Sequence, residues 1–170
     1  MSKVIVWTSL AVFFVGMLQT AVLSHITAVK VMPDIVLLII VYAEISNGSK
    51  TGMICGFIAG LLSDFLSAAP LGLSSFILTL AGFIIGRLCG VYNVSKVFLP
   101  ALLGLSGFLF KAALLFGLNF VFGKNIHVYN IFHINFLTEL VLNTVCAPLV
   151  FLFLNMFSST FKMREFPVYE

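Results

Sequence analysis

Acidic residues at two positions in the apolar parts of this chain are candidates for acid–base chemistry. Asp34 follows Pro33 at the start of one apolar segment, and Asp64 lies near the end of another. Two carboxylates that share a site can act as general acid and general base, as in aspartyl proteases. Alternatively, Asp34 caps a helix after Pro33, and Asp64 reaches interfacial water or a backbone donor. We favour the cap for Asp34, and packing or partner binding over catalysis for Asp64.

Lys111 and Glu139 are charged residues within apolar runs, where a charge is costly and implies a partner or a function. Lys111 falls near the middle of its run, and Glu139 lies about a turn and a half into the next. Because the chain doubles back between them, we predict an intramembrane Lys111–Glu139 ion pair. A proton relay, a substrate counter-ion or pairing with an acid on another protein are the functional alternatives. Glu44 and Arg87 lie near segment ends and are expected to extend to water.

Neither the serine motif nor the cysteines indicate a catalytic or metal site. The tetrapeptide Gly104-Leu105-Ser106-Gly107 matches the G-x-S-G of rhomboid-type intramembrane proteases, but a serine nucleophile needs an aligned histidine base. The histidines His25, His127 and His133 all lie in breaks between apolar runs. The cysteines Cys55, Cys89 and Cys146 show no C-x-x-C spacing and are expected to be small packing residues. We therefore expect no enzyme activity, no metal and no cofactor.

The composition shows which elements must position these residues. Apolar residues make up 61% of the chain and charged residues 9%, whereas about 25% of an ordinary soluble domain is charged. The mean hydropathy is +1.18. Long apolar runs without alternation predict membrane-spanning helices rather than a barrel. Basic residues occur singly rather than in a patch, so binding of nucleic acid is not expected.

The apolar runs predict an all-α polytopic membrane protein with six transmembrane helices. The predicted spans cover residues 4–24, 33–46, 51–68, 73–92, 97–122 and 134–157, approximately. Residues 1–157 therefore form a single transmembrane domain, and residues 158–170 a cytoplasmic C-terminal tail. The first run is long enough to cross a bilayer and is taken as a retained helix rather than a signal peptide. The second is short, and Asn47-Gly48-Ser49 after it is a turn cluster.

The distribution of Lys and Arg predicts the orientation. One set of segment ends carries Lys3, Lys50, Arg87, Lys96, Lys162 and Arg164, and the other carries Lys30 and Lys124. This bias places both termini in the cytoplasm.

Two ladders of glycines at four-residue spacing lie in neighbouring apolar runs. The first consists of Gly52, Gly56 and Gly60, with Asp64 one step further, and the second of Gly82, Gly86 and Gly90. On a helix each ladder forms a smooth groove in which a second backbone can approach closely. We expect the first ladder, with Asp64 as its anchor, to face a partner helix. The second is expected to pack mainly against the first.

The stretch from Pro33 to Leu73 resembles the rod shape-determining protein MreD family. The shared features are Pro33-Asp34, the ladder Gly52, Gly56, Gly60-Leu61-Leu62-Ser63-Asp64, and the break Pro70-Leu71-Gly72-Leu73. The resemblance implies a non-enzymatic inner-membrane component of the bacterial elongation machinery, which contributes to cell shape and lateral peptidoglycan synthesis. It implies binding to MreC and, through MreC, to MreB, RodA and a class B penicillin-binding protein.

The family's fold is thought to be similar to the six-helix substrate-binding subunits of energy-coupling factor transporters. A vitamin-binding subunit of that kind is therefore the alternative function. It would need a polar outer pocket, for which the candidate residues are Asn119, His127, Asn130, His133 and Asn135.

Overall fold

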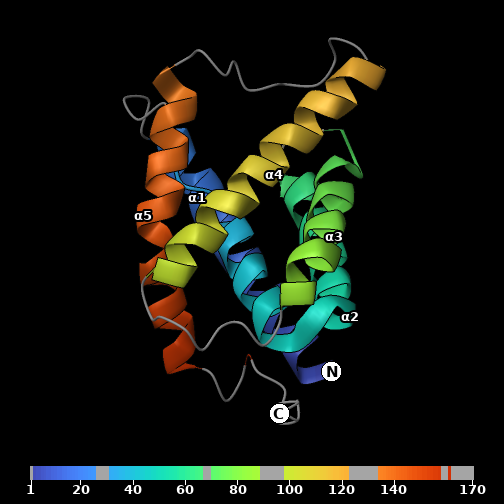
Figure 1. The fold of residues 1–170 in the computed structure, drawn as a ribbon, viewed down its shortest axis with the longest axis vertical. Coiled ribbons are helices and arrows are strands. Elements are labelled where there is room, and N and C mark those ends of the chain that lie inside the picture. Colours follow the sequence, from blue (N-terminus) through green and yellow to red (C-terminus); the bar gives the residue numbers. More distant parts are fainter. Residues whose placement is uncertain are drawn as a thin grey trace.

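The computed structural model is all-helical in the part of the chain that it describes, which is residues 2–25, 31–66, 70–88, 98–122, 134–157 and 161. Its elements are α1 (Ser2–His25), α2 (Ile35–Leu66), α3 (Leu73–Ile85), the short 3-10 helix η1 (Gly86–Leu88), α4 (Phe98–Phe122) and α5 (Ile134–Met156) (Figure 1). The predicted helical class is confirmed.

The prediction of six membrane-spanning helices is wrong in its count. Three helices in the described ranges are long and apolar enough to cross a membrane, over Lys3–Ala21 of α1, Phe98–Phe120 of α4 and Ile134–Met156 of α5. The helix α3 is apolar but shorter. The second and third predicted spans both belong to α2, which is a broken helix.

The break in α2 lies at Gly48, within the predicted turn cluster. Gly48 has φ 80° and ψ 173°, which is non-helical, and positive φ is open to glycine at little steric cost. A Cβ placed on Gly52 would lie 3.3 Å from Cα of Glu44, although eight residues of straight helix rise about 12 Å. The chain therefore folds back at Gly48, and α2 has a first half (35–47) and a second half (49–66).

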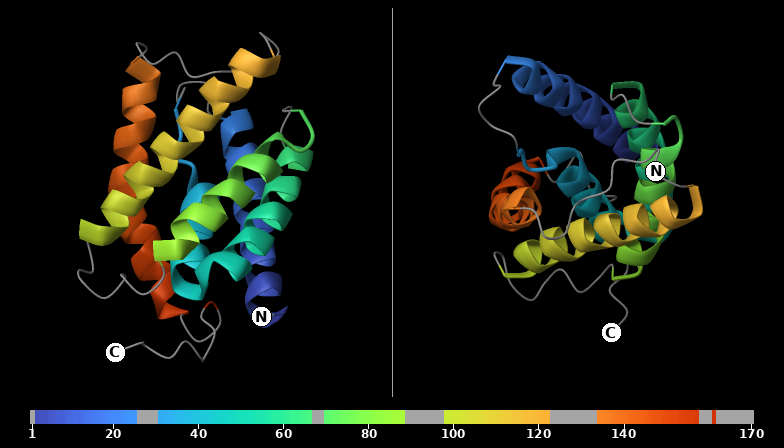
Figure 2. Two further views of the ribbon diagram at one scale, coloured as in Figure 1. Left: turned by 45° about the vertical axis from the view of Figure 1, so that its right-hand side comes forward. Right: turned by 90° about the horizontal axis from the view of Figure 1, so that it is seen from above.

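The first half of α2 forms the centre of the molecule. Seen from above, it is ringed by α1, α3, α4 and α5 (Figure 2). Its buried side chains are mostly apolar and cover every face of the helix, with Glu44 and Asn47 as the polar exceptions; the apolar ones include Leu37, Leu38, Ile40, Val41 and Tyr42. A helix that is apolar all round is expected only where other helices or lipid enclose it. At 1.5 Å per residue this half is only about 20 Å long, short of the about 30 Å of bilayer hydrocarbon.

The remaining helices surround this centre, with apolar side chains on their outer faces. The helix α1 packs on α2, the second half of α2 packs on α3, and α4 packs on α5. Exposed outward residues include Phe14 and Leu18 of α1, Phe116 and Phe120 of α4, and Leu149 of α5. An outer surface of this kind suits lipid rather than water. The helix α1 begins, and α5 ends, at the same end of the bundle (Figure 1).

Candidate functional site

The first glycine ladder packs inside the chain, against α3. A Cβ on Gly56 would overlap the backbone of Leu78, and one on Gly60 would overlap the backbone of Ser75. Gly56 and Gly60 are both buried. The ladder therefore has no open face for a partner helix, and the prediction that it faces a partner is wrong.

The second ladder supplies the other side of this contact. A Cβ on Gly82 would lie 2.7 Å from the carbonyl carbon of Gly52, and one on Gly86 would lie 2.5 Å from Cα of Ser49. Gly90 lies outside the described residues. The prediction that the second ladder packs against the first is confirmed for Gly82 and Gly86. Close backbone contact of this kind is how small residues hold membrane helices together.

Asp64 joins the second half of α2 to the start of α3. Its buried carboxylate accepts hydrogen bonds from the backbone N–H groups of Gly72 (2.8 Å) and Ser74 (3.0 Å). Gly72 itself has φ 93°, a left-handed conformation that favours glycine. The expectation that Asp64 reaches a backbone donor is confirmed. The carboxylate satisfies N–H groups that the first turn of a helix leaves unpaired.

Asp34 is the centre of a second polar network, at the start of α2. One carboxylate oxygen accepts a hydrogen bond from the N–H of Leu37 (3.0 Å), so the predicted N-cap is confirmed. The other oxygen pairs with Nζ of Lys111 from the middle of α4. The N–H of Asp34 donates to Oδ1 of Asn143 on α5 (2.8 Å). Nε2 of Gln19 on α1 donates to the carbonyl oxygen of Pro33 (2.7 Å).

This network joins α1, α2, α4 and α5 at one point. The Lys111 and Asp34 side chains are 24% and 21% exposed, and Asn143 is fully buried. The ion pair observed for Lys111 is thus with Asp34. Glu139 is half-buried on α5, one helical turn from Asn143, and its predicted pairing with Lys111 stays a prediction. Asp34 and Asp64 belong to separate networks, which gives no support to a carboxylate pair.

Sequence reasoning missed three polar residues that the structure makes important. In the sequence, Asn143 and Gln19 are single polar residues within apolar runs. This pattern indicates a hydrogen bond to another helix, but it does not identify the group that is bonded. Glu44 was expected to reach water, and this is wrong because its side chain is 0% exposed. Arg87 is exposed as expected, and its guanidinium carbon lies 4.4 Å from the ring centroid of Phe83.

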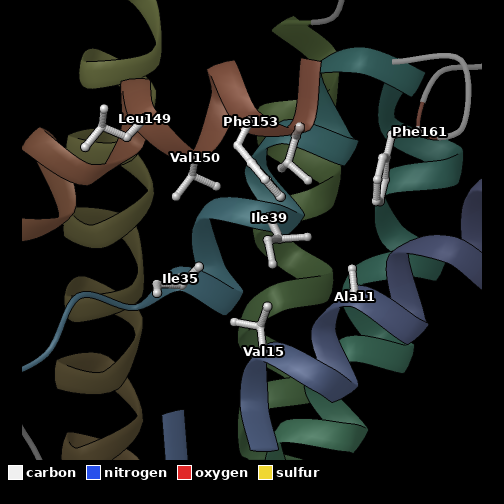
Figure 3. Close-up of a pocket in the computed structure, with 9 residues that line it drawn as sticks. Ala11, Val15, Ile35, Ile39, Leu149, Val150, Phe153 and Phe161 are labelled. Carbon is white, nitrogen blue, oxygen red and sulfur yellow. The ribbon is translucent and has the colours of Figure 1, made fainter. Parts of the chain in front are cut away.

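An apolar groove of about 380 Å³ lies between α1 and α5, over the first half of α2 (Figure 3). It is lined by Ala11, Val15, Ile35, Ile39, Leu149, Val150, Phe153, Leu154 and Phe161. None of these side chains can hydrogen-bond, so the groove differs from the polar pocket that a vitamin would need. Asn119 and Asn135 are half-buried near the ends of α4 and α5. His127, Asn130 and His133 lie outside the described residues.

The described residues show no arrangement for catalysis at Ser106. This side chain is exposed, and its hydroxyl donates to the carbonyl oxygen of Leu103 one turn back (3.1 Å). The three histidines fall outside the side chains that the structure describes. Within the described ranges, no group of three or more His, Cys, Asp or Glu residues could hold a metal ion.

The fold and these networks define an all-helical protein of the membrane type, with three helices long and apolar enough to cross a membrane in the described ranges and polar residues that tie its own helices together. The chain belongs to the family of the rod shape-determining protein MreD, whose family model matches residues 1–157. It is thereby a member of a family that acts in cell shape. Comparison with the curated proteins and with the solved structures gave no match. The predicted likeness to energy-coupling factor subunits, and the vitamin-binding alternative, therefore have no support.

Proposed function

We propose that this chain is a non-enzymatic scaffold of the bacterial elongation complex in the inner membrane. In this role it binds MreC and, through MreC, MreB, RodA and a class B penicillin-binding protein, so that lateral peptidoglycan synthesis maintains the rod. The observation that carries the proposal is the match of residues 1–157 to the MreD family. Residues 1–157 would act as one transmembrane domain, with 158–170 as a cytoplasmic tail.

The arrangement of polar groups supports a scaffold rather than an enzyme. Asp34, Lys111, Asn143 and Asp64 all bond to groups of this chain. A scaffold needs rigid helices with an outer surface on which other membrane proteins can pack, and close packing rather than a polar cleft drives such contacts.

We place the partner contact on the outward apolar faces of α1, α4 or α5, and away from the two ladders. These faces carry large exposed side chains, among them Trp7 and Leu18 on α1, Phe120 on α4, and Val145 and Leu149 on α5. Since α3 covers the first ladder, a partner could reach it only by displacing that helix.

Recovery of MreC tests the proposal. The tagged chain is purified from native membranes in mild detergent, and MreC in the eluate is quantified. Alanine replacements are then made in sets, one set on the outward face of each helix. We expect MreC to copurify with the native chain, and at least one set to lower its recovery fivefold or more at unchanged protein level. Phe76→Ala is the control, because this exposed side chain lies on α3, outside the three proposed faces.

Cell shape provides the second measurement. We expect depletion of the chain to turn rods into spheres, and the set that loses MreC to fail in restoring rods. Absence of MreC from the eluate of the native chain, together with normal rods on depletion, would contradict the proposal.

A further inference from the structure

Glu44 is a buried carboxyl group that the networks described above do not use. It lies in the first half of α2, its side chain is 0% exposed, and among the described residues neither carboxyl oxygen has a hydrogen-bond partner. A polar group in this position is costly unless something compensates it, and an ionised one much more so. A fully buried acid without a donor therefore indicates a ligand that supplies positive charge or a proton.

The second half of α2 packs against Glu44, and through Cys55 it also meets α1. A Cβ on Gly52 would lie 2.9 Å from Cγ of Glu44, so the first glycine of the ladder makes room for the acidic side chain. Cys55, one turn further along α2, lies next to Thr8 of α1 and within electrostatic reach of Glu44. Thr8 and Cys55 are themselves 0% and 1% exposed. Glu44, Cys55 and Thr8 are thus all shielded from the surroundings of the bundle.

The charge of this place selects the kind of ligand. Glu44 supplies one negative charge, and Cys55 is the other titratable group that faces it in the described structure. Of the basic side chains on the surrounding elements, Lys111 pairs with Asp34 at the other end of the first half of α2. The others, Lys3, Lys50 and Arg87, are exposed. A single carboxylate is neutralised by one monovalent cation, whereas a divalent ion would leave an unpaired positive charge in the bundle.

We propose that the carboxyl group of Glu44 is a buried binding site for one monovalent cation, a proton or Na⁺. The site lies four residues from the fold-back at Gly48, which is about 6 Å along the helix axis. The ligand would therefore enter from the end of the bundle at which α2 turns. This proposal does not depend on binding to MreC.

Thermal unfolding of the purified full-length chain tests the site. Because a ligand that binds only the folded state raises its stability, the melting temperature should rise with the concentration of the bound cation. The single tryptophan, Trp7, is next to Thr8 and reports unfolding by fluorescence. One series varies NaCl against choline chloride at constant ionic strength, and a second varies pH without Na⁺.

We expect the melting temperature of the native chain to rise by about 3 °C or more for each tenfold increase in the bound cation. A rise with Na⁺ identifies Na⁺, and a rise only on lowering the pH identifies a proton. Glu44→Gln should abolish the response. Ser9→Ala is the control, because the Ser9 hydroxyl bonds back to Ile5 of its own helix and should leave the response unchanged. Equal responses of the native chain and Glu44→Gln to both series would overturn the proposal.

A second measurement uses the native chain alone and so does not depend on folding of the variant. Dicyclohexylcarbodiimide adds to a protonated carboxyl in an apolar site: the acid proton passes to a carbodiimide nitrogen, and the carboxyl oxygen bonds to the carbodiimide carbon. We expect mass spectrometry to find the adduct on Glu44, with a labelling rate at least threefold lower in saturating Na⁺ or at raised pH. Absence of the adduct, or a rate that neither condition changes, would also overturn the proposal.

Discussion

At the residue scale, the two aspartates have the same task in different places. The Asp34 carboxylate accepts a hydrogen bond from the N–H of Leu37 at the start of α2. The Asp64 carboxylate accepts hydrogen bonds from the N–H groups of Gly72 and Ser74 at the start of α3. The first turn of a helix leaves N–H groups without partners, and hydrocarbon offers none. A short polar side chain just before or beside that turn solves this problem. Both acids are therefore explained by helix capping without any catalytic step.

Removing the charge of Lys111 should destabilise the protein more than removing both charges of its ion pair. Lys111→Met leaves the carboxylate of Asp34 without its cation, and we expect the free energy of unfolding to fall by about 3 kcal/mol. Breaking a buried ion pair by removing one partner costs about 3–5 kcal/mol. We take the lower value because both side chains of this pair are partly exposed. The double variant Asp34→Asn/Lys111→Met should recover most of the loss, since Asn also caps helices. Unfolding in mixed detergent micelles measures each value.

The exposed Lys3 is the control for this pair. Lys3→Met removes the same charge from a side chain that lies at the surface, and its effect should stay within about 0.5 kcal/mol. The coupling between Asp34 and Lys111 would be refuted if the double variant lost as much unfolding free energy as Asp34→Asn and Lys111→Met lose together.

At the element scale, the contact between α2 and α3 is set by glycines on both helices. Gly56 and Gly60 face the backbone of Leu78 and Ser75, and Gly82 faces Gly52. Each glycine lowers intrinsic helix stability by about 1 kcal/mol relative to alanine. Their presence in a helix is therefore justified by the approach of the other backbone, which no larger residue permits.

Alanine at a ladder position should destabilise the protein, although alanine is the better helix former. In Gly60→Ala the new methyl group overlaps the backbone of Ser75, so α2 and α3 must move apart, at a cost of about 1–3 kcal/mol. In Gly117→Ala the methyl group meets open space, and stability should rise by up to about 1 kcal/mol. Equal effects of the two variants on the unfolding free energy would contradict the tight interface.

Sequence patterns predicted what depends on local rules and failed where distant segments meet. The helical class, the turn at Gly48 and the cap at Asp34 follow from hydropathy and local chemistry. The count of spans failed because the second and third predicted spans are the two halves of α2, which is broken at Gly48 and is not among the helices long and apolar enough to cross a membrane. Lys111 could not be assigned to Asp34, because that contact joins residues 77 apart in the chain. The burial of Glu44 likewise depends on α1 and on the second half of α2.

At the scale of the whole molecule, the central first half of α2 determines the arrangement of the other helices. Its start is tied to α4 and α5 through Lys111 and Asn143, and to α1 through Gln19 and Pro33. Its end turns back at Gly48 into the contact with α3. All four neighbours are thus fixed to one short helix, which leaves their outward faces free for lipid or for other membrane proteins.

The placement of the ends leads to a prediction about orientation in the membrane. The helix α1 begins and α5 ends at the same end of the bundle (Figure 1), and the exposed Lys3 is in the first turn of α1. Positively charged ends are retained in the cytoplasm, so both termini should lie there, as the counts of Lys and Arg also predict.

Fusions of reporter proteins at two positions measure this orientation. Alkaline phosphatase fused within residues 123–133, after α4, should be active because it is exported. The same enzyme fused after Phe157 should be inactive, whereas green fluorescent protein at that position should fluoresce. The opposite pattern would show that the basic ends face outward and would remove the proposed cytoplasmic location of the tail.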